Sequence, residues 1–144
     1  MAHLIGDSGK SRIVAFIIDN FVAFLLSALL VGVIHSGNAL VSGTALALTY
    51  LSYFFIFELA WGRTPGKFLQ GLVVRDISGA RCNAKQILLR TLARILEANP
   101  FLLGGIPAGV AIMASTEKQR IGDTLAGTVV VSRQAVLDVA SSDA

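Results

Sequence analysis

The feature that most constrains this chain is an apolar stretch from Arg12 to Ile34 that carries Asp19 one third of the way along it. A helix rises about 1.5 Å per residue, so this stretch reaches roughly 34 Å and could cross the hydrocarbon core of a bilayer. Because the apolar region of a signal peptide is only about 7–15 residues long, we favour a retained span over a cleaved signal. An ionised aspartate at bilayer depth costs about 2.5–3.5 kcal/mol, so Asp19 should face protein or trapped water.

Composition supports a membrane protein over a soluble one. The chain is 54% hydrophobic and only 15% charged, with a mean hydropathy of +0.71, whereas soluble domains are about 25% charged. A second span is predicted over residues 39–60. A third uncharged block, residues 99–116, contains two prolines and three glycines. That composition is typical of interrupted helices that line transporter cavities, but a close-packed kinked helix would have it too.

Small and polar side chains recur every four residues in the first span, at Ala15, Asp19, Ala23 and Ser27. At this spacing they form one stripe along the helix, and small residues let a neighbouring helix approach closely. The stripe therefore predicts a packed seam that Asp19 faces, with the large apolar side chains turned towards lipid.

The segment between the second and third blocks, residues 61–98, is basic. Beside hydrophobic spans such a segment favours anionic lipid headgroups as partners over nucleic acid. Residues 84–98 within it form an amphipathic pattern, which predicts a helix lying in the headgroup region. The predicted headgroup contacts are Lys67, Arg75, Arg81, Lys85, Arg90 and Arg94.

Two valine-rich segments predict a small β element on the cytosolic side. Residues 71–76 and 129–131 have strong strand propensity, and each is the likeliest partner of the other in this chain. Asp123 precedes the second strand, where its simplest role is to cap a short helix.

Lysine and arginine are absent from the loop between the first two spans. By the positive-inside rule this loop lies outside and the N-terminus inside. Pairing of the two strands would bring the C-terminus to the cytosolic side as well. We therefore expect a multi-pass protein of the plasma (inner) membrane with both termini in the cytosol.

The predicted fold is an all-α integral membrane protein. It is a small helical bundle with two full spans, a broken amphipathic or hydrophobic third segment, and the small cytosolic β element. Residues 1–11 form a cytosolic tail, residues 12–131 a single membrane domain, and residues 132–144 a polar, frayed C-terminal tail.

Three pieces of the chain resemble the RDD family of membrane proteins. They are Arg12 with Asp19 in the first span, the stretch GRTPGKFLQGLVVRD, and Asp123 within QRIGDTLAGTVVV. The resemblance implies a small helical membrane domain named for one arginine and two aspartates, which here are Arg12, Asp19 and Asp123. Transport has been proposed for the family, and some members are described as sodium/proton antiporters. The resemblance implies no catalytic residues.

The partners of these three charged residues can be narrowed from their spacing. Arg12 and Asp19 are seven residues apart, which is about 10 Å along a helix, so they should not pair directly. We prefer a pairing of Arg12 with Asp123. Glu58 lies three residues before Trp61 at the end of the second span. We favour snorkelling of Glu58 to the cytosolic boundary over a buried functional carboxylate.

Two functions follow from this arrangement. In the first, a homo-oligomer transports Na⁺ or H⁺, with Asp19 as the membrane carboxylate that exchanges the cation. Oxygen ligands or cavity-lining residues would then come from Asn20, Ser27, Thr49, Ser52 and Glu58. In the second, a non-transporting module scaffolds other membrane proteins or binds lipid, and the three charged residues are structural.

Enzymatic activity is the class that the sequence favours least. The single cysteine, Cys82, and two distant histidines make no zinc site. No nucleophile–base pair is evident either. We therefore expect neither an enzyme nor a bound metal or cofactor.

Overall fold

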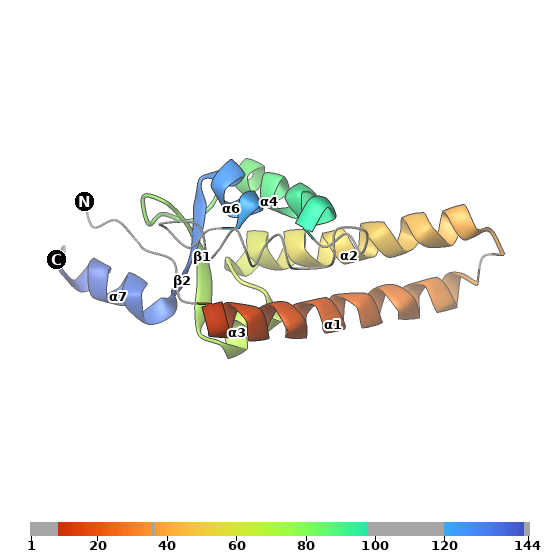
Figure 1. Ribbon diagram of the computed structural model, residues 1–144, viewed down its shortest axis with the longest axis horizontal. Coiled ribbons are helices and arrows are strands. Elements are labelled where there is room, and N and C mark those ends of the chain that lie inside the picture. Colours follow the sequence, from red (N-terminus) through yellow and green to blue (C-terminus); the bar gives the residue numbers. More distant parts are fainter. Residues whose placement is uncertain (1–8, 36, 98–119, 143–144) are drawn as a thin grey trace.

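Two long apolar helices dominate the computed structural model, which describes residues 9–35, 37–97 and 120–142. Helix α1 (Gly9–Ile34) and helix α2 (Ala39–Trp61) lie side by side and run antiparallel along the long axis of the molecule (Figure 1). The first span thus begins three residues earlier than predicted, inside the expected N-terminal tail. Asn38 caps α2 by accepting a hydrogen bond from the Leu40 N–H at 2.9 Å.

Both helices are long and apolar enough to cross a membrane. In an 18-residue apolar stretch of each helix, only 22% of α1 and 11% of α2 is buried inside the protein. The core helix of a soluble protein would be covered instead, and here large side chains such as Phe21, Leu40 and Leu48 are more than half exposed. An outward apolar surface of this kind suits contact with lipid.

The buried side of α1 is the predicted stripe. Its buried residues are Arg12, Ala15, Asp19, Ala23 and Ser27. Ala23 packs against Tyr53 and Phe54 of α2 in one core cluster. The small side chains of the stripe therefore form the seam between the two long helices, as expected.

A two-stranded antiparallel sheet lies at the end of the molecule where α1 begins and α2 ends (Figure 1). Strand β1 (Leu72–Asp76) pairs with strand β2 (Thr128–Ser132), with Val73 opposite Val131 and Val74 opposite Val130. The predicted pairing of the two valine-rich segments is confirmed.

Both faces of this sheet are covered, which explains how so small a sheet is stable. Leu72, Val74 and Val130 pack with Ala15 of α1 on one face. On the opposite face, Val73, Val129 and Val131 pack with two valines of helix α7 (Arg133–Ser142). The expected frayed tail is thus a helix over Arg133–Ser142, because its apolar side chains can cover a face of the sheet.

In the described part of the chain, three further helices lie near this end. Helix α3 (Pro65–Leu69) contacts α1, and helix α4 (Ala84–Glu97) packs against both α2 and helix α6 (Ile121–Ala126). Asn83 directly precedes α4 and caps it, since its side chain accepts from the Gln86 N–H at 2.9 Å. The structure is therefore mostly helical, with two candidate spans and one small sheet. The predicted third block, residues 99–116, lies outside the described residues.

Helix α4 is amphipathic in an unexpected sense. Its leucines Leu88, Leu89 and Leu92 are about half exposed, whereas Arg90 and Arg94 are buried. The apolar side of α4 is therefore exposed, and its two arginines are turned towards the protein. This arrangement is stable where the surroundings are lipid and the charged side finds partners inside.

Candidate functional site: a buried charge network

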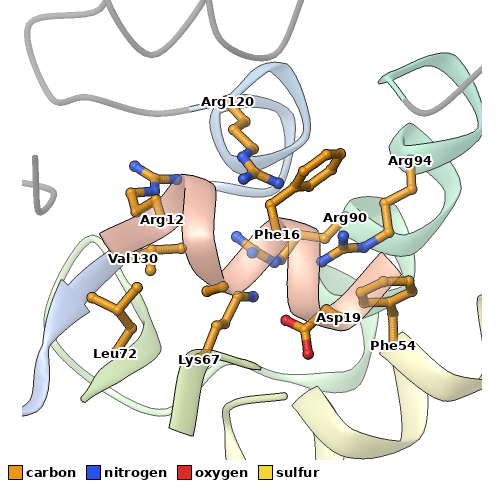
Figure 2. Close-up of a pocket in the computed structure, with 11 residues that line it drawn as sticks. Arg12, Phe16, Asp19, Phe54, Lys67, Leu72, Arg90, Arg94, Arg120 and Val130 are labelled. Carbon is orange, nitrogen blue, oxygen red and sulfur yellow. The ribbon is translucent and has the colours of Figure 1, made fainter. Parts of the chain in front are cut away.

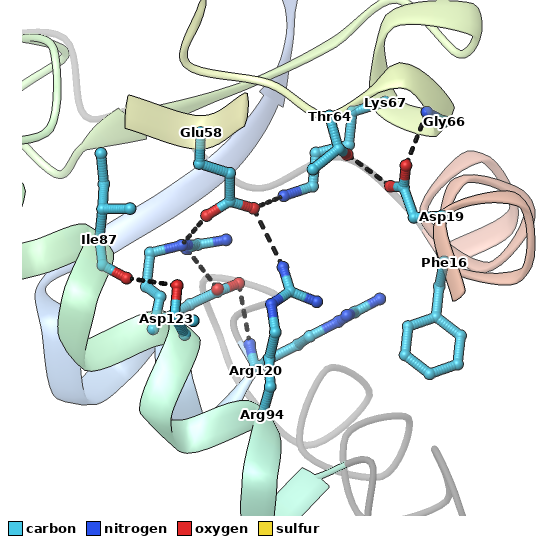
Figure 3. A network of polar contacts seen from close by, with 12 residues as sticks. Phe16, Asp19, Glu58, Thr64, Gly66, Lys67, Ile87, Arg94, Arg120 and Asp123 are labelled. Carbon is cyan, nitrogen blue, oxygen red and sulfur yellow. Dashed lines mark hydrogen bonds and ion pairs between the residues drawn. The ribbon is translucent and has the colours of Figure 1, made fainter. Parts of the chain in front are cut away.

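Asp19 is held by three hydrogen-bond donors from α2 and the start of α3. Its Oδ1 accepts from the Tyr53 hydroxyl at 3.1 Å and from the Gly66 N–H at 2.8 Å. Its Oδ2 accepts from the hydroxyl of Thr64. Both oxygens are thus occupied, and the carboxylate supplies an acceptor to the first turn of α3 from another helix (Figure 3).

Gly66 is the point of closest approach between α3 and α1. A Cβ on Gly66 would lie 2.5 Å from the Ala15 carbonyl oxygen and 2.8 Å from Cγ of Asp19. Only glycine allows this approach, because the obstacle is backbone as well as side chain. Pro65 at the first helical position pre-sets the turn, and the Thr64 side chain binds Asp19 rather than capping its own helix.

Arg12 pairs with Asp123, as predicted. Nη2 of Arg12 lies 2.6 Å from Oδ2 of Asp123, and both side chains are almost fully buried. The two residues are 111 positions apart, so this ion pair joins the start of α1 to α6. Asp123 is in the first turn of α6 rather than at its cap, and its Oδ2 also accepts from the Arg120 N–H at 3.2 Å.

Arg90 of α4 connects this pair to Glu58 of α2. Its Nη1 lies 2.5 Å from Oδ1 of Asp123 and 2.6 Å from the Thr128 hydroxyl, and its Nε lies 3.1 Å from Oε2 of Glu58. Glu58 Oε1 in turn accepts from Lys67 and, at 3.0 Å, from Nη2 of Arg94 (Figure 3). A continuous chain of charge-assisted hydrogen bonds therefore runs from α1 through α6 and α4 to α2 and α3.

The electrostatic environment shifts the pKa values of Asp123 and Lys67, two network residues outside the two spans. Burial alone would raise the pKa of Asp123, but Arg90 and Arg12 outweigh it and lower the pKa to about 2. Burial lowers the pKa of Lys67 to about 8, with Glu58 opposing and Arg90 and Arg94 adding to the effect. The carboxylate thus stays ionised at neutral pH, while the ammonium is held where positive charge is already abundant.

Four predictions about basic and acidic residues are wrong. Glu58 does not snorkel, because it is 1% exposed and bound by three cations. Lys67, Arg90 and Arg94 do not face headgroups, because they are buried around Glu58. Of the other three predicted headgroup residues, Arg81 and Lys85 are exposed and Arg75 is half-buried.

The residues proposed as oxygen ligands do not gather around Asp19. The hydroxyls of Ser27 and Thr49 donate to carbonyls of their own helices, at 2.7 and 2.8 Å. Asn20 accepts from Tyr50 and donates to the Phe16 carbonyl, and Ser52 is exposed. None of these four is a hydrogen-bond partner of Asp19 in the described part of the chain.

Sequence reasoning missed Tyr53, Thr64, Gly66 and Thr128 as members of the network. The TPG sequence at residues 64–66 is typical of a helix start, but nothing in it indicates which distant carboxylate it meets. Within residues 9–35, 37–97 and 120–142, no group of three or more His, Cys, Asp or Glu could hold a metal ion.

The comparisons with known proteins agree with this architecture. The model of the RDD family matches residues 9–127, which include both long helices and all three residues of the Arg–Asp–Asp set. Comparison with curated proteins and with solved structures gave no match. The family consists of membrane proteins, in keeping with the two exposed apolar helices. This chain belongs to the RDD family.

Proposed function

We propose that this protein is a non-transporting membrane module that binds lipid or other membrane proteins, with Arg12, Asp19 and Asp123 in structural roles. One observation carries the proposal. Every carboxylate oxygen of Asp19, Glu58 and Asp123 accepts a hydrogen bond from another residue of the protein. Carboxylates that are fully occupied in this way lock elements together.

The exposed apolar side chains of the long helices and α4 suit contact with a lipid bilayer, which is the first partner that we propose. The leucines of α4 are exposed, as are many large apolar side chains of the two long helices, and Arg81 and Lys85 are exposed near the start of α4. Those two cations, with Arg75, remain the proposed contacts for anionic headgroups. In this arrangement the protein lies in the plasma (inner) membrane, and the end that carries the sheet is on the cytosolic side. We expect no enzymatic activity.

Transport of Na⁺ or H⁺ by a homo-oligomer is the second candidate. It is supported by the position of Asp19, a buried carboxylate within a spanning helix that also lines a small cavity. Two features oppose it. The N–H of Gly66 and two hydroxyls already donate to Asp19, and five basic side chains line the same cavity. A cation there would be repelled and would have to displace these donors.

Reconstitution into liposomes separates the two candidates. Under an imposed proton or sodium gradient, we expect the flux to equal that of empty liposomes. Asp19→Asn should leave that flux unchanged and lower the unfolding temperature of the protein in detergent. A flux that the wild-type protein supports, and that folded Asp19→Asn lacks, would replace the first candidate by the second.

A further inference from the structure

An open groove lies where α2 ends and α3 begins. It shares no lining residue with the cavity beside Asp19 that Figure 2 shows. Its volume is about 310 Å³, at the lower end of the range of about 300–1,000 Å³ that is usual for small-molecule sites. The residues that line it are Phe57, Trp61, Arg63, Thr64, Pro65 and Phe68. Because the groove is open, it can hold one part of a longer molecule whose remainder lies outside.

Three aromatic side chains make much of the wall apolar. The rings of Phe57 and Trp61 are 5.4 Å apart between their centres, and Trp61 and Phe68 are 61% and 58% exposed. Aromatic side chains exposed at the end of a spanning helix suit the boundary between lipid headgroups and acyl chains. The first part of an acyl chain that runs along α2 could therefore pack against these rings.

Arg63 supplies the groove with positive charge. Its guanidinium carbon lies 4.5 Å from the ring centre of Phe68, a contact that leaves the N–H groups in the guanidinium plane free to donate. Within residues 9–35, 37–97 and 120–142, Arg63 forms no ion pair and no acidic residue lines the groove. A guanidinium in this position can donate two parallel hydrogen bonds to a phosphate group.

We propose that this groove binds an anionic phospholipid, such as phosphatidylglycerol, from the cytosolic leaflet. Its phosphate would accept from Arg63, and one acyl chain would begin against Phe57 and Trp61. An anionic headgroup is favoured over a zwitterionic one, because an ammonium or choline group would lie near Arg63 with no acidic partner in the groove. This inference deepens the lipid-binding role proposed above and rests on it.

The test uses the fluorescence of Trp61, which is the single tryptophan of the chain and so reports on this groove alone. Full-length protein is reconstituted in phosphatidylcholine bilayers with a small fraction of phosphatidylglycerol brominated near the headgroup end of its acyl chains, because bromine quenches tryptophan on contact. Brominated phosphatidylcholine at the same mole fraction measures random contact with lipid. We expect phosphatidylglycerol to bind about fivefold more tightly, the effect of one arginine beside an anionic headgroup.

Arg63→Gln is the decisive variant, since it removes the charge but keeps a polar side chain. The affinity for phosphatidylglycerol should fall to that for phosphatidylcholine, and the protein should stay folded because no ion pair is lost. Arg63→Lys keeps the charge and should keep a preference for phosphatidylglycerol. Arg133→Gln, which removes an exposed arginine of α7, should bind both lipids as the wild type does.

Three results would overturn the proposal. Equal quenching by the two brominated lipids would remove the site but leave the membrane module standing. A preference that Arg63→Gln retains would place the anionic lipid elsewhere on the protein. Quenching by neither lipid would show that Trp61 does not meet lipid. If the protein is then a dimer by light scattering, a second copy covers the groove, whereas a monomer would contradict the membrane placement itself.

Discussion

At the scale of single residues, two features of the network set its geometry: a glycine that lets α3 touch α1, and carboxylates with no free oxygen. Gly66 could not be recognised from the sequence as a contact to Asp19, since its neighbours only indicate a turn. The Arg12–Asp123 pair could be predicted from the sequence, because Asp19 is too far along the same helix to pair with Arg12.

Gly66→Ala should destabilise the protein by about 1–3 kcal/mol, the usual cost of overpacking. The added methyl group would meet the Ala15 carbonyl and Asp19, and so weaken the hydrogen bond from the Gly66 N–H. Urea unfolding in detergent measures this change. Gly43→Ala in α2 is the control, because nothing lies within 4 Å of its added Cβ. Equal stability of the two variants would contradict the close approach.

Acid should weaken the network through Asp123. Its pKa is lowered from 3.8 to about 2 in the folded protein, so between these pH values the unfolded chain binds more protons. The stabilisation, about 2 kcal/mol, is therefore complete above pH 4 and is lost as the pH falls through about 2. Asp123→Asn should flatten this part of the unfolding-temperature profile. Asp138→Asn, at an exposed position of α7, should keep it, and an unaltered profile in Asp123→Asn would refute the assignment.

At the scale of elements, the two spans and the strand pairing could be predicted, because continuous apolar length and valine-rich runs are local signals. The orientation of α4 could not be predicted from the sequence. An amphipathic pattern shows that two faces differ, but not whether the apolar face meets the protein or the lipid. Here Glu58 and Asp123, distant in sequence, draw Arg90 and Arg94 inward. The helical tail was missed because its role is to cover the sheet.

Glu58 is the acceptor that holds α2, α3 and α4 together. Glu58→Gln should cost about 3–5 kcal/mol, since it leaves Lys67, Arg90 and Arg94 buried with one carboxylate fewer. Thermal unfolding followed by circular dichroism measures the loss. Asp138→Asn, which removes an exposed carboxylate, should change stability by less than about 0.5 kcal/mol. Comparable losses in the two variants would show that Glu58 carries no such role.

At the scale of the whole molecule, the sheet and α7 lie at the end where α1 begins, and the loop between α1 and α2 lies at the other end (Figure 1). With Cys82 replaced by serine, single cysteines at Ser78 and Ala140 should therefore react with an impermeant reagent from the cytosolic side. A cysteine at Gly37 should react only from outside. Labelling of all three from one side would contradict a two-span arrangement.

Arg12 and Asp123 bind one another and so join the first span to a segment near the far end of the chain. A double-mutant cycle with Arg12→Gln and Asp123→Asn, measured by unfolding in detergent, tests it most directly. If the two side chains pair, the double variant should lose less stability than the two single losses together, with a coupling of about 1–3 kcal/mol. Additive losses, within about 0.3–0.5 kcal/mol, would contradict it.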